Sequence, residues 1–304
     1  MPNKRPVIAL VGATATGKTA LSVALAHALG GEVINADSMQ FYRGMDIGTA
    51  KATVAERQGV AHHLLDIYDL SVEASVANFQ DLARETIADI RARDHVPILT
   101  GGSGLYVRAA LDTLEFPPTD PQLRQELTEY VEKHGTSTLV AELGHVDPIA
   151  VERLHDERRI IRAVEVYRLT GRPFSSYMPT REYHPTISPV VQVGLRIDRT
   201  VLHQRIAQRV QQMIERGWLD EIEELRRRGL AQAPTASRAI GYRQMLEYLA
   251  GKLTETEAIE STVVATRRFA RRQETWFKAD PRVHWIDAES KHAVEQIQAL
   301  LESD

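Results

Sequence analysis

The segment Val7 to Thr19, VIALVGATATGKT, joins an apolar, β-branched run to a glycine-rich stretch. Its second part fits the pattern GxxxxGK[ST] and lies between an expected strand, Val7 to Val11, and an expected helix, Lys18 to Leu29. Glycines let backbone N–H groups turn toward an anion, and the helix N-terminus adds partial positive charge. Lys18 supplies a mobile cation, and the Thr19 hydroxyl suits Mg²⁺. The segment therefore predicts a phosphate-binding loop made of Gly12, Ala13, Thr14, Ala15, Thr16, Gly17, Lys18 and Thr19.

The rest of the chain alternates expected strands with expected helices. Strands are expected at Glu32 to Ala36, Val96 to Thr100, Val190 to Ile197 and Val283 to Ile286, and helices at Val76 to Arg91, Arg199 to Arg216, Leu219 to Arg228, Tyr242 to Ala250 and Glu255 to Phe277, with a last one ending near Leu301. Such alternation favours a parallel sheet covered by helices. From Phe116 to Pro189, helical periodicity replaces strand character.

We therefore expect an α/β fold, a P-loop NTPase-like parallel sheet core with an inserted all-helical domain. The core is expected to comprise residues 1–115 and 190–304, and the insert residues 116–189. The turn cluster PPTDP, Pro117 to Pro121, marks the start of the insert.

The composition narrows the cellular setting. The chain of 304 residues is 43% hydrophobic, has no cysteine and carries a formal net charge of −4. The lack of cysteine excludes disulfides and thiolate zinc sites, which fits a reducing cytosol. No apolar run of about 18 residues and no secretory signal is present. We expect a cytoplasmic protein, with any nucleic-acid binding dependent on local clusters of Lys and Arg.

Asp37 follows the apolar run Val33 to Ala36, which places it at the carboxyl end of a parallel strand, where ligands bind in such sheets. Three roles are open for it: N-cap of the segment Ser38 to Gln40, carboxylate near Mg²⁺, or general base. The later strand ends in Leu99 to Gly102 without a carboxylate, which weakens the interpretation as a kinase or another NTPase.

Several segments, in the same order along the chain, resemble those of the bacterial tRNA dimethylallyltransferases. The resemblance runs from about residue 6 to residue 286, through GATATGKT (12–19), DSMQFY (37–42), GMDIGTAK (44–51), HHLLDI (62–67), GGSGLY (101–106), RRIIRAVEVY (158–167), GYRQ (241–244) and TRRFARRQETWFK (266–278). It implies transfer of a dimethylallyl group from dimethylallyl diphosphate to N6 of the adenosine 3′ of the anticodon in tRNA.

The resemblance also implies roles for the residues named above. The loop Gly12 to Thr19 would hold the diphosphate, with Mg²⁺ on Thr19, and Lys18 and Arg209 would stabilise the departing pyrophosphate. Asp37 would accept the proton of the attacking amine. A solvated helix face is the alternative for Arg209.

Contacts with the tRNA anticodon stem-loop are implied for Asp37, Ser38, Met39, Gln40, Ser103, Gln125, Arg158, Arg159, Arg162 and Arg243. On a helical wheel Arg158, Arg159 and Arg162 share one face with Glu165, opposite Ile160, Ala163 and Val164. Such a basic face contacts phosphates or merely keeps a helix soluble.

A second basic ridge is formed by Arg267, Arg268, Arg271 and Arg272. It could follow the anticodon stem or pair with the acidic helix at Glu221 to Glu224. For Trp218, Trp276 and Trp285 we expect packing rather than stacking on bases. His62 and His63 are neighbours whose side chains would leave a strand on opposite faces, so we assign no metal site there.

Two other functions stay open at this stage: prenyl transfer to free adenine nucleotides, and a P-loop small-molecule kinase or nucleotide-dependent switch. The long insert and its basic helices argue against the first. We expect a monomer that has no membrane partner.

Overall fold

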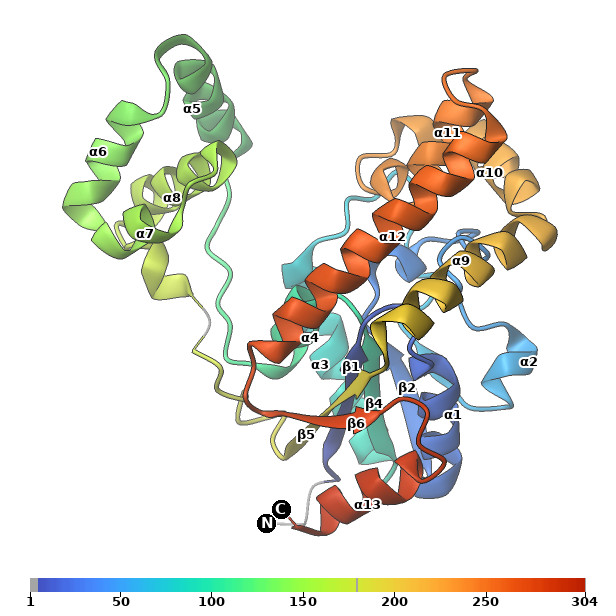
Figure 1. Ribbon diagram of the computed structural model, residues 1–304. Coiled ribbons are helices and arrows are strands. Elements are labelled where there is room, and N and C mark those ends of the chain that lie inside the picture. The colour runs from blue at the N-terminus through green and yellow to red at the C-terminus, as the bar shows by residue number, and fades with distance from the viewer. Residues whose placement is uncertain (1–4, 179, 304) are drawn as a thin grey trace. The chain divides into compact units, whose positions relative to one another are not determined.

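The computed structural model describes residues 5–178 and 180–303, and its centre is a parallel sheet of six strands (Figure 1). The strand order is β3-β2-β4-β1-β5-β6. The strands are β1 Val7–Gly12, β2 Gly31–Asn35, β3 His62–His63, β4 Val96–Gly101, β5 Val190–Arg196 and β6 Val283–Asp287. The α/β class is confirmed. Strand β3 was not expected, because two residues that pair with Val33 and Ile34 are too few to give a period-2 pattern.

Both faces of the sheet are buried, because successive strand residues point to opposite sides. Val7, Ala9 and Val11 pack in one hydrophobic cluster with residues of α3 and α4. Ile8 and Leu10 pack in another with residues of α1 and α13. The bounds are α1 Lys18–Leu29, α3 Val76–Ala92, α4 Gly104–Leu111 and α13 Ala293–Ser303. Strand β1 is thus central in the sheet order and covered on both sides, which gives the phosphate loop a rigid base.

A third cluster lies among the helices that follow β5, around Trp218, Ile222 and Tyr242. These helices are α9 Arg199–Glu215, α10 Trp218–Arg227, η3 Leu230–Gln232, η4 Ala236–Arg238, α11 Tyr242–Leu249 and α12 Glu255–Lys278. Two short helices, η1 Ser38–Phe41 and α2 Val54–Arg57, lie between β2 and β3. In the described part of the chain, no helix combines the length and the apolar character that crossing a bilayer requires.

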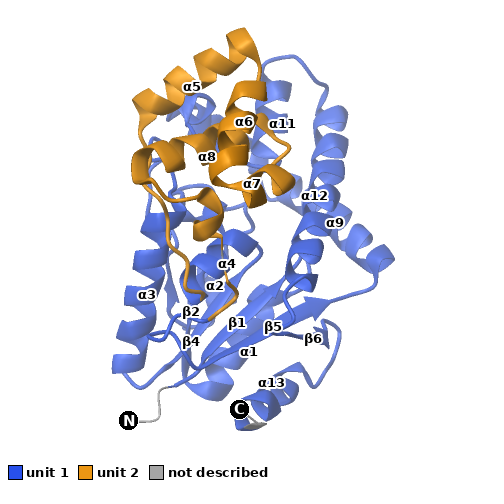
Figure 2. Ribbon diagram, turned by 90° about the vertical axis from the view of Figure 1, so that its left-hand side faces the viewer, with its two compact units in different colours: residues 1–111, 183–304 blue, residues 112–182 orange. Residues whose placement is uncertain are grey.

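The chain divides into two compact units, coloured blue and orange in Figure 2. Unit 1 comprises residues 1–111 and 183–304, and unit 2 is the helical segment 112–182. Unit 2 contains α5 Pro121–His134, α6 Ser137–Val146, α7 Pro148–Arg153, α8 Glu157–Thr170 and η2 Phe174–Tyr177. It has its own core, in which Leu127, Leu143 and Val164 are buried.

Unit 2 begins and ends earlier than the segment Phe116 to Pro189 expected from the sequence. Its two ends meet where the Thr113 N–H donates to the Glu182 carbonyl at 2.8 Å. The following residues belong to unit 1, since Ile187 is buried in the cluster under the sheet and Tyr183 packs against it. The chain is irregular on both sides of this boundary, so the sequence has no periodic pattern from which the boundary could be predicted.

Glu32 of β2 is a buried carboxylate bound by one arginine and two histidines. It accepts hydrogen bonds from His63 at 2.5 Å, His95 at 2.6 Å and Arg93 at 2.8 Å, and only 6% of the residue is exposed. Burial raises the pKa of Glu32, but the bonds from Arg93, His63 and His95 outweigh it and lower the pKa from 4.5 to about 2. The cluster ties β2 to the edge strand β3 and to the turn before β4.

We expect this cluster to stabilise the fold above pH 5 and to lose its effect in acid. A carboxylate whose folded pKa is depressed contributes stability above its unfolded value of 4.5, and that stability is lost as the pH falls toward the folded value. The full shift corresponds to on the order of 3 kcal/mol. In urea unfolding, the free energy of unfolding of Glu32→Gln should be lower than that of the wild type. This difference should shrink as the pH falls from about 5 to about 3. A deficit independent of pH would contradict the assignment.

Candidate active site

The phosphate loop connects β1 to α1 and is held by backbone geometry. Gly12 has φ 139°, and a Cβ there would lie 2.9 Å from the Leu195 carbonyl oxygen of β5, so only glycine fits. Gly17 precedes α1 in the left-handed region, and no side chain of the described residues caps this helix. The first-turn N–H groups are therefore open to an anion.

Gln273 of α12 binds the phosphate loop through its side chain. Its amide oxygen accepts from the Thr14 N–H at 2.9 Å, and its amide nitrogen donates to the Gly102 carbonyl at 3.0 Å. The side chain is buried. It therefore bridges the phosphate loop and the end of β4, two segments that the sheet places side by side.

Lys18, Arg209 and Asp37 share one poorly solvated site. Lys18 Nζ donates to the carbonyls of Gly12 at 3.0 Å and Ala13 at 2.6 Å. Burial and the charge of Arg209 lower the pKa of Lys18, Asp37 opposes the shift, and the resulting pKa is about 7. Burial also lowers the pKa of Arg209, again opposed by Asp37. Two cations and one carboxylate thus face each other where water is scarce.

Asp37 begins the short helix η1 and acts as its N-cap. Its Oδ1 accepts from the Met39 N–H at 3.0 Å, and its own N–H donates to Asn35 at 2.9 Å. Burial raises the pKa of Asp37, while the bond from Met39 and the charges of Lys18 and Arg209 lower it, and the balance is upward. Among the described residues, no donor bonds to Oδ2. The capping role is real, and it leaves one carboxylate oxygen available.

Two cavities meet at these charges. The phosphate cavity, about 630 Å³, is lined by the loop, Lys18, Thr19, the α9 residues Arg205 and Arg209, and Arg216 just after α9. The acceptor cavity, about 400 Å³, is lined largely by apolar side chains, including Met39, Trp218 and Phe269. Both are lined by Thr14, Ala15, Asp37, Thr49, Arg209 and Met213. A carboxylate and a guanidinium therefore stand at the junction of an anion site and an apolar one.

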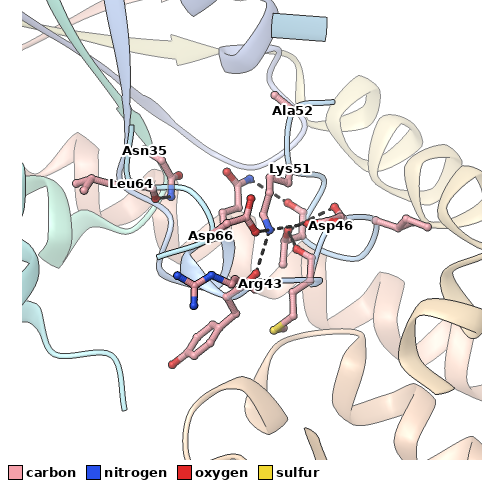
Figure 3. Close-up of polar contacts among 12 residues, drawn as sticks. Asn35, Arg43, Asp46, Lys51, Ala52, Leu64 and Asp66 are labelled. Atoms are coloured by element: carbon pink, nitrogen blue, oxygen red, sulfur yellow. Dashed lines mark hydrogen bonds and ion pairs between the residues drawn. The ribbon is translucent and has the colours of Figure 1, made fainter. Parts of the chain in front are cut away.

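Lys51 holds the loop Gly44 to Lys51 against the site (Figure 3). The side chain is 3% exposed, and its Nζ contacts Asp46 at 2.6 Å, Asp66 at 2.5 Å and the Tyr42 carbonyl at 3.0 Å. Figure 3 shows the ammonium between the two carboxylates. Since the Asp66 N–H donates to the Gln40 carbonyl at 3.3 Å, this ion cluster braces the helix that Asp37 caps.

Glu221 of α10 fixes the same loop. Its carboxylate accepts from the N–H groups of Asp46 at 3.0 Å, Ile47 at 2.6 Å and Gly48 at 3.3 Å, and from the Tyr242 hydroxyl at 2.6 Å. Sequence reasoning missed Gln273, Lys51 and Glu221. Each lies in or near a segment that carries the family resemblance or a predicted helix, but only the folded chain shows which backbone groups they bind.

The other predicted contacts in unit 1 divide into two groups. Ser38, Met39 and Ser103 line the acceptor cavity, and Gln40 lines the phosphate cavity while donating to the Thr49 carbonyl at 3.1 Å. Arg243 lines neither cavity; it is exposed and lies 3.8 Å from Glu247.

In unit 2, Arg158 and Arg159 are exposed at the start of α8. Arg162 is engaged by the carbonyls of Pro117 and Pro118 and by Glu165 at 2.8 Å. Glu165 lies on the side of α8 that carries Arg162, as the helical wheel predicts, but it is fully buried and not solvent-exposed, because Arg124, Arg162 and the Asp120 N–H all bind it. Gln125 is exposed on α5 and donates to Glu129.

The parallel sheet carries a phosphate loop, helix α9 brings arginines to that loop, and the carboxylate of Asp37 lies at the mouth of a second cavity. Together these features define a P-loop enzyme with two substrate sites. The family model described as IPP transferase matches residues 40–280. A tRNA dimethylallyltransferase of Pseudarthrobacter chlorophenolicus is 59% identical over 97% of this chain and 98% of its own. This chain belongs to the IPP transferase family.

Solved structures agree. The full-length tRNA isopentenylpyrophosphate transferase from Bacillus halodurans is 42% identical, with a TM-score of 0.73 over 99% of this chain and 96% of that one. A eukaryotic dimethylallyltransferase described as acting on tRNA is 28% identical, with a TM-score of 0.81 over 98% of this chain and 78% of that one. The resemblance inferred from the motifs is confirmed.

Binding of a diphosphate should be accompanied by proton uptake near pH 8. Because the pKa of Lys18 is about 7, the Lys18 amine is neutral in most molecules at pH 8. A bound anion raises that pKa. Inorganic pyrophosphate should bind with uptake of a fraction of a proton, and its Kd should rise as the pH rises above 7. Calorimetry in two buffers with different ionisation enthalpies measures the uptake. Lys18→Met should abolish it, and equal heats for the wild type in both buffers would contradict the prediction.

Lys51→Met should lower the free energy of unfolding by about 2 kcal/mol, because it leaves two carboxylates without their shared cation. The matched control is Arg43→Ala in the same region. Its ion pair with Asp69 is 51% and 65% exposed, so its loss should cost less than about 1 kcal/mol. Urea unfolding compares the two variants, and equal losses would show that the Lys51 cluster is no more than a surface pair.

Proposed function

We propose that this chain transfers a dimethylallyl group from dimethylallyl diphosphate to N6 of the adenosine 3′-adjacent to the anticodon in tRNA, and releases pyrophosphate. The observation that carries the proposal is the position of Asp37 and Arg209 at the junction of the phosphate and acceptor cavities. The names of the relatives support the same reaction.

The phosphate cavity suits a diphosphate that leaves as one unit. When the allylic C–O bond breaks, negative charge grows on pyrophosphate. The loop N–H groups, Lys18 and Arg209 are already oriented around this region and need little reorganisation. A transfer of this kind needs no carboxylate at the end of β4 to activate water or a phosphoryl acceptor.

The acceptor cavity suits an adenine presented to the allylic carbon. The exocyclic amine is a weak nucleophile, and loss of its proton during attack helps the reaction. Asp37 lines both cavities, no donor of the described residues bonds to its Oδ2, and its raised pKa makes it a stronger base than a solvated carboxylate. The amine nitrogen forms the new C–N bond, Asp37 takes the proton, and the C–O bond electrons leave with pyrophosphate.

Mg²⁺ is the cofactor we propose, bound by the Thr19 hydroxyl and the diphosphate oxygens. Thr19 is exposed to the phosphate cavity, which fits this role. Among the described residues, no cluster of three acidic or histidine ligands could hold a metal alone, and Mg²⁺ commonly binds through substrate phosphates. When bound, the ion would neutralise charge on the departing pyrophosphate.

For RNA binding we propose that unit 2 contacts the anticodon arm through Arg158 and Arg159, which are exposed and whose side chains form no hydrogen bond or ion pair with the other described residues. Arg162, Gln125 and Arg243 stay weaker predictions, because each already bonds within its own unit. The monomeric state and the cytoplasmic location also stay predictions.

The test uses labelled dimethylallyl diphosphate with three acceptors. Unmodified tRNA should become labelled, whereas tRNA without adenosine at that position and free AMP should not. Labelling of AMP would favour a nucleotide prenyltransferase. Hydrolysis of ATP without prenyl transfer would favour the kinase or switch interpretation.

The variants Asp37→Asn and Asp37→Ala should distinguish the role of Asp37 as general base from its role as helix N-cap. Both variants lose the proton acceptor, so kcat should fall about 100-fold or more. Asparagine still caps a helix whereas alanine does not, so only Asp37→Ala should also lower the melting temperature. Single-turnover transfer and tRNA binding measure the effects, with tRNA affinity expected to stay within a few fold. Near-normal kcat in Asp37→Asn would remove Asp37 from the chemistry.

A further inference from the structure

Trp276 of α12 is 44% exposed, while Trp218 is 1% exposed. Packing, which we expected for both from the sequence, is therefore correct for Trp218 and wrong for Trp276. An exposed indole is unusual on a helix whose other large residues near this end, such as Phe277, are buried. Its position calls for an explanation beyond stability.

The indole of Trp276 is held against the backbone at the start of α4. A Cβ on Gly104 would lie 2.1 Å from Trp276 Cδ1, so the ring occupies the space that any other side chain at this position would need. Leu105, the next residue, is also exposed, by 42%. One side of the ring is thus fixed while the rest faces solvent.

This ring lies on the same helix as residues that line the acceptor cavity. Phe269 and Arg272 line the cavity, and Arg272, Phe269 and Trp276 recur at helical spacing on one face of α12, the long orange helix of Figure 1. Trp276 lies one turn beyond Arg272, about 6 Å along the axis. Ser103, which precedes Gly104, lines the same cavity.

The surroundings of Trp276 are positively charged. Arg268, Arg271 and Arg272 are exposed, and no ion pair is found for them among the described residues. Pairing with the acidic helix, one of our sequence-based alternatives, is wrong: Glu223 and Glu224 pair with Arg226 and Arg227, and Glu221 binds the loop at Asp46. The guanidinium of Arg272 lies 5.7 Å from the Phe269 ring centroid.

We infer that Trp276 and Arg272 form a stacking platform for the nucleobase next to the target adenosine. The inference rests on the proposed function and extends it. A target base that enters the cavity leaves its stack, and its neighbour loses a partner. Aromatic rings and arginine planes are the usual replacement partners for unstacked bases of single-stranded RNA. The adjacent arginines would attract the phosphates.

The experiment measures prenyl transfer to an anticodon stem-loop RNA. Trp276→Ala should raise KM for the RNA about tenfold, the size expected for loss of one stacked base, with kcat little changed. Trp276→Phe should retain most of the affinity. Val264→Ala is the matched control, since Val264 is 43% exposed on the same helix but lies about three turns before Trp276, about 18 Å along the axis and about 120° around it; its KM should equal that of the wild type.

An abasic nucleotide placed on either side of the target adenosine identifies the stacked base. At one of the two positions it should raise KM for the wild type but add little for Trp276→Ala, because the two changes remove the same contact. Additive effects at both positions, or an unchanged KM in Trp276→Ala, would overturn the platform. Failure of the proposed function is distinguishable, since the wild type would then not prenylate the intact RNA.

Discussion

The site depends on keeping Lys18, Arg209 and Asp37 together where solvent screens them poorly. Each charge would be costly to bury alone; Asp37 lowers that cost for both cations, whereas Arg209 raises it for Lys18. When Lys18 is protonated, the two cations exceed the one carboxylate, and the site has an unbalanced positive charge that a diphosphate can neutralise. Substrate affinity and the electrostatics of the leaving group therefore have the same physical source.

Residues that are distant in the sequence fix the positions of these charges. Gln273 of α12 bonds the phosphate loop, Glu221 of α10 bonds the loop at Asp46 to Gly48, and Lys51 joins that loop to Asp66. All three are polar groups that satisfy irregular backbone, which neither a helix nor a sheet could do. The phosphate and acceptor cavities are thus shaped by hydrogen bonds to loops, on a base formed by the sheet.

Local patterns were enough to predict the loop Gly12 to Thr19, the position of Asp37 and the α/β class, because each depends on neighbours in sequence. Strand β3 was missed because two residues carry no periodicity. Glu165 was misplaced because its burial depends on Arg124, forty-one residues away. Trp276 looks like a packing residue in the sequence, but in the folded chain it is 44% exposed. The sequence could not reveal these long-range contacts.

The N-cap made by Asp37 has a consequence for the reaction cycle. A neutral carboxyl accepts hydrogen bonds more weakly than a carboxylate does. If Asp37 collects the proton from the adenine amine, the bond that seats Met39 beside the acceptor cavity weakens at the moment when the product has formed. The wall nearest the modified base would then relax after bond formation and tighten again once the proton is lost, so that release of the product and readiness for the next substrate follow one protonation event.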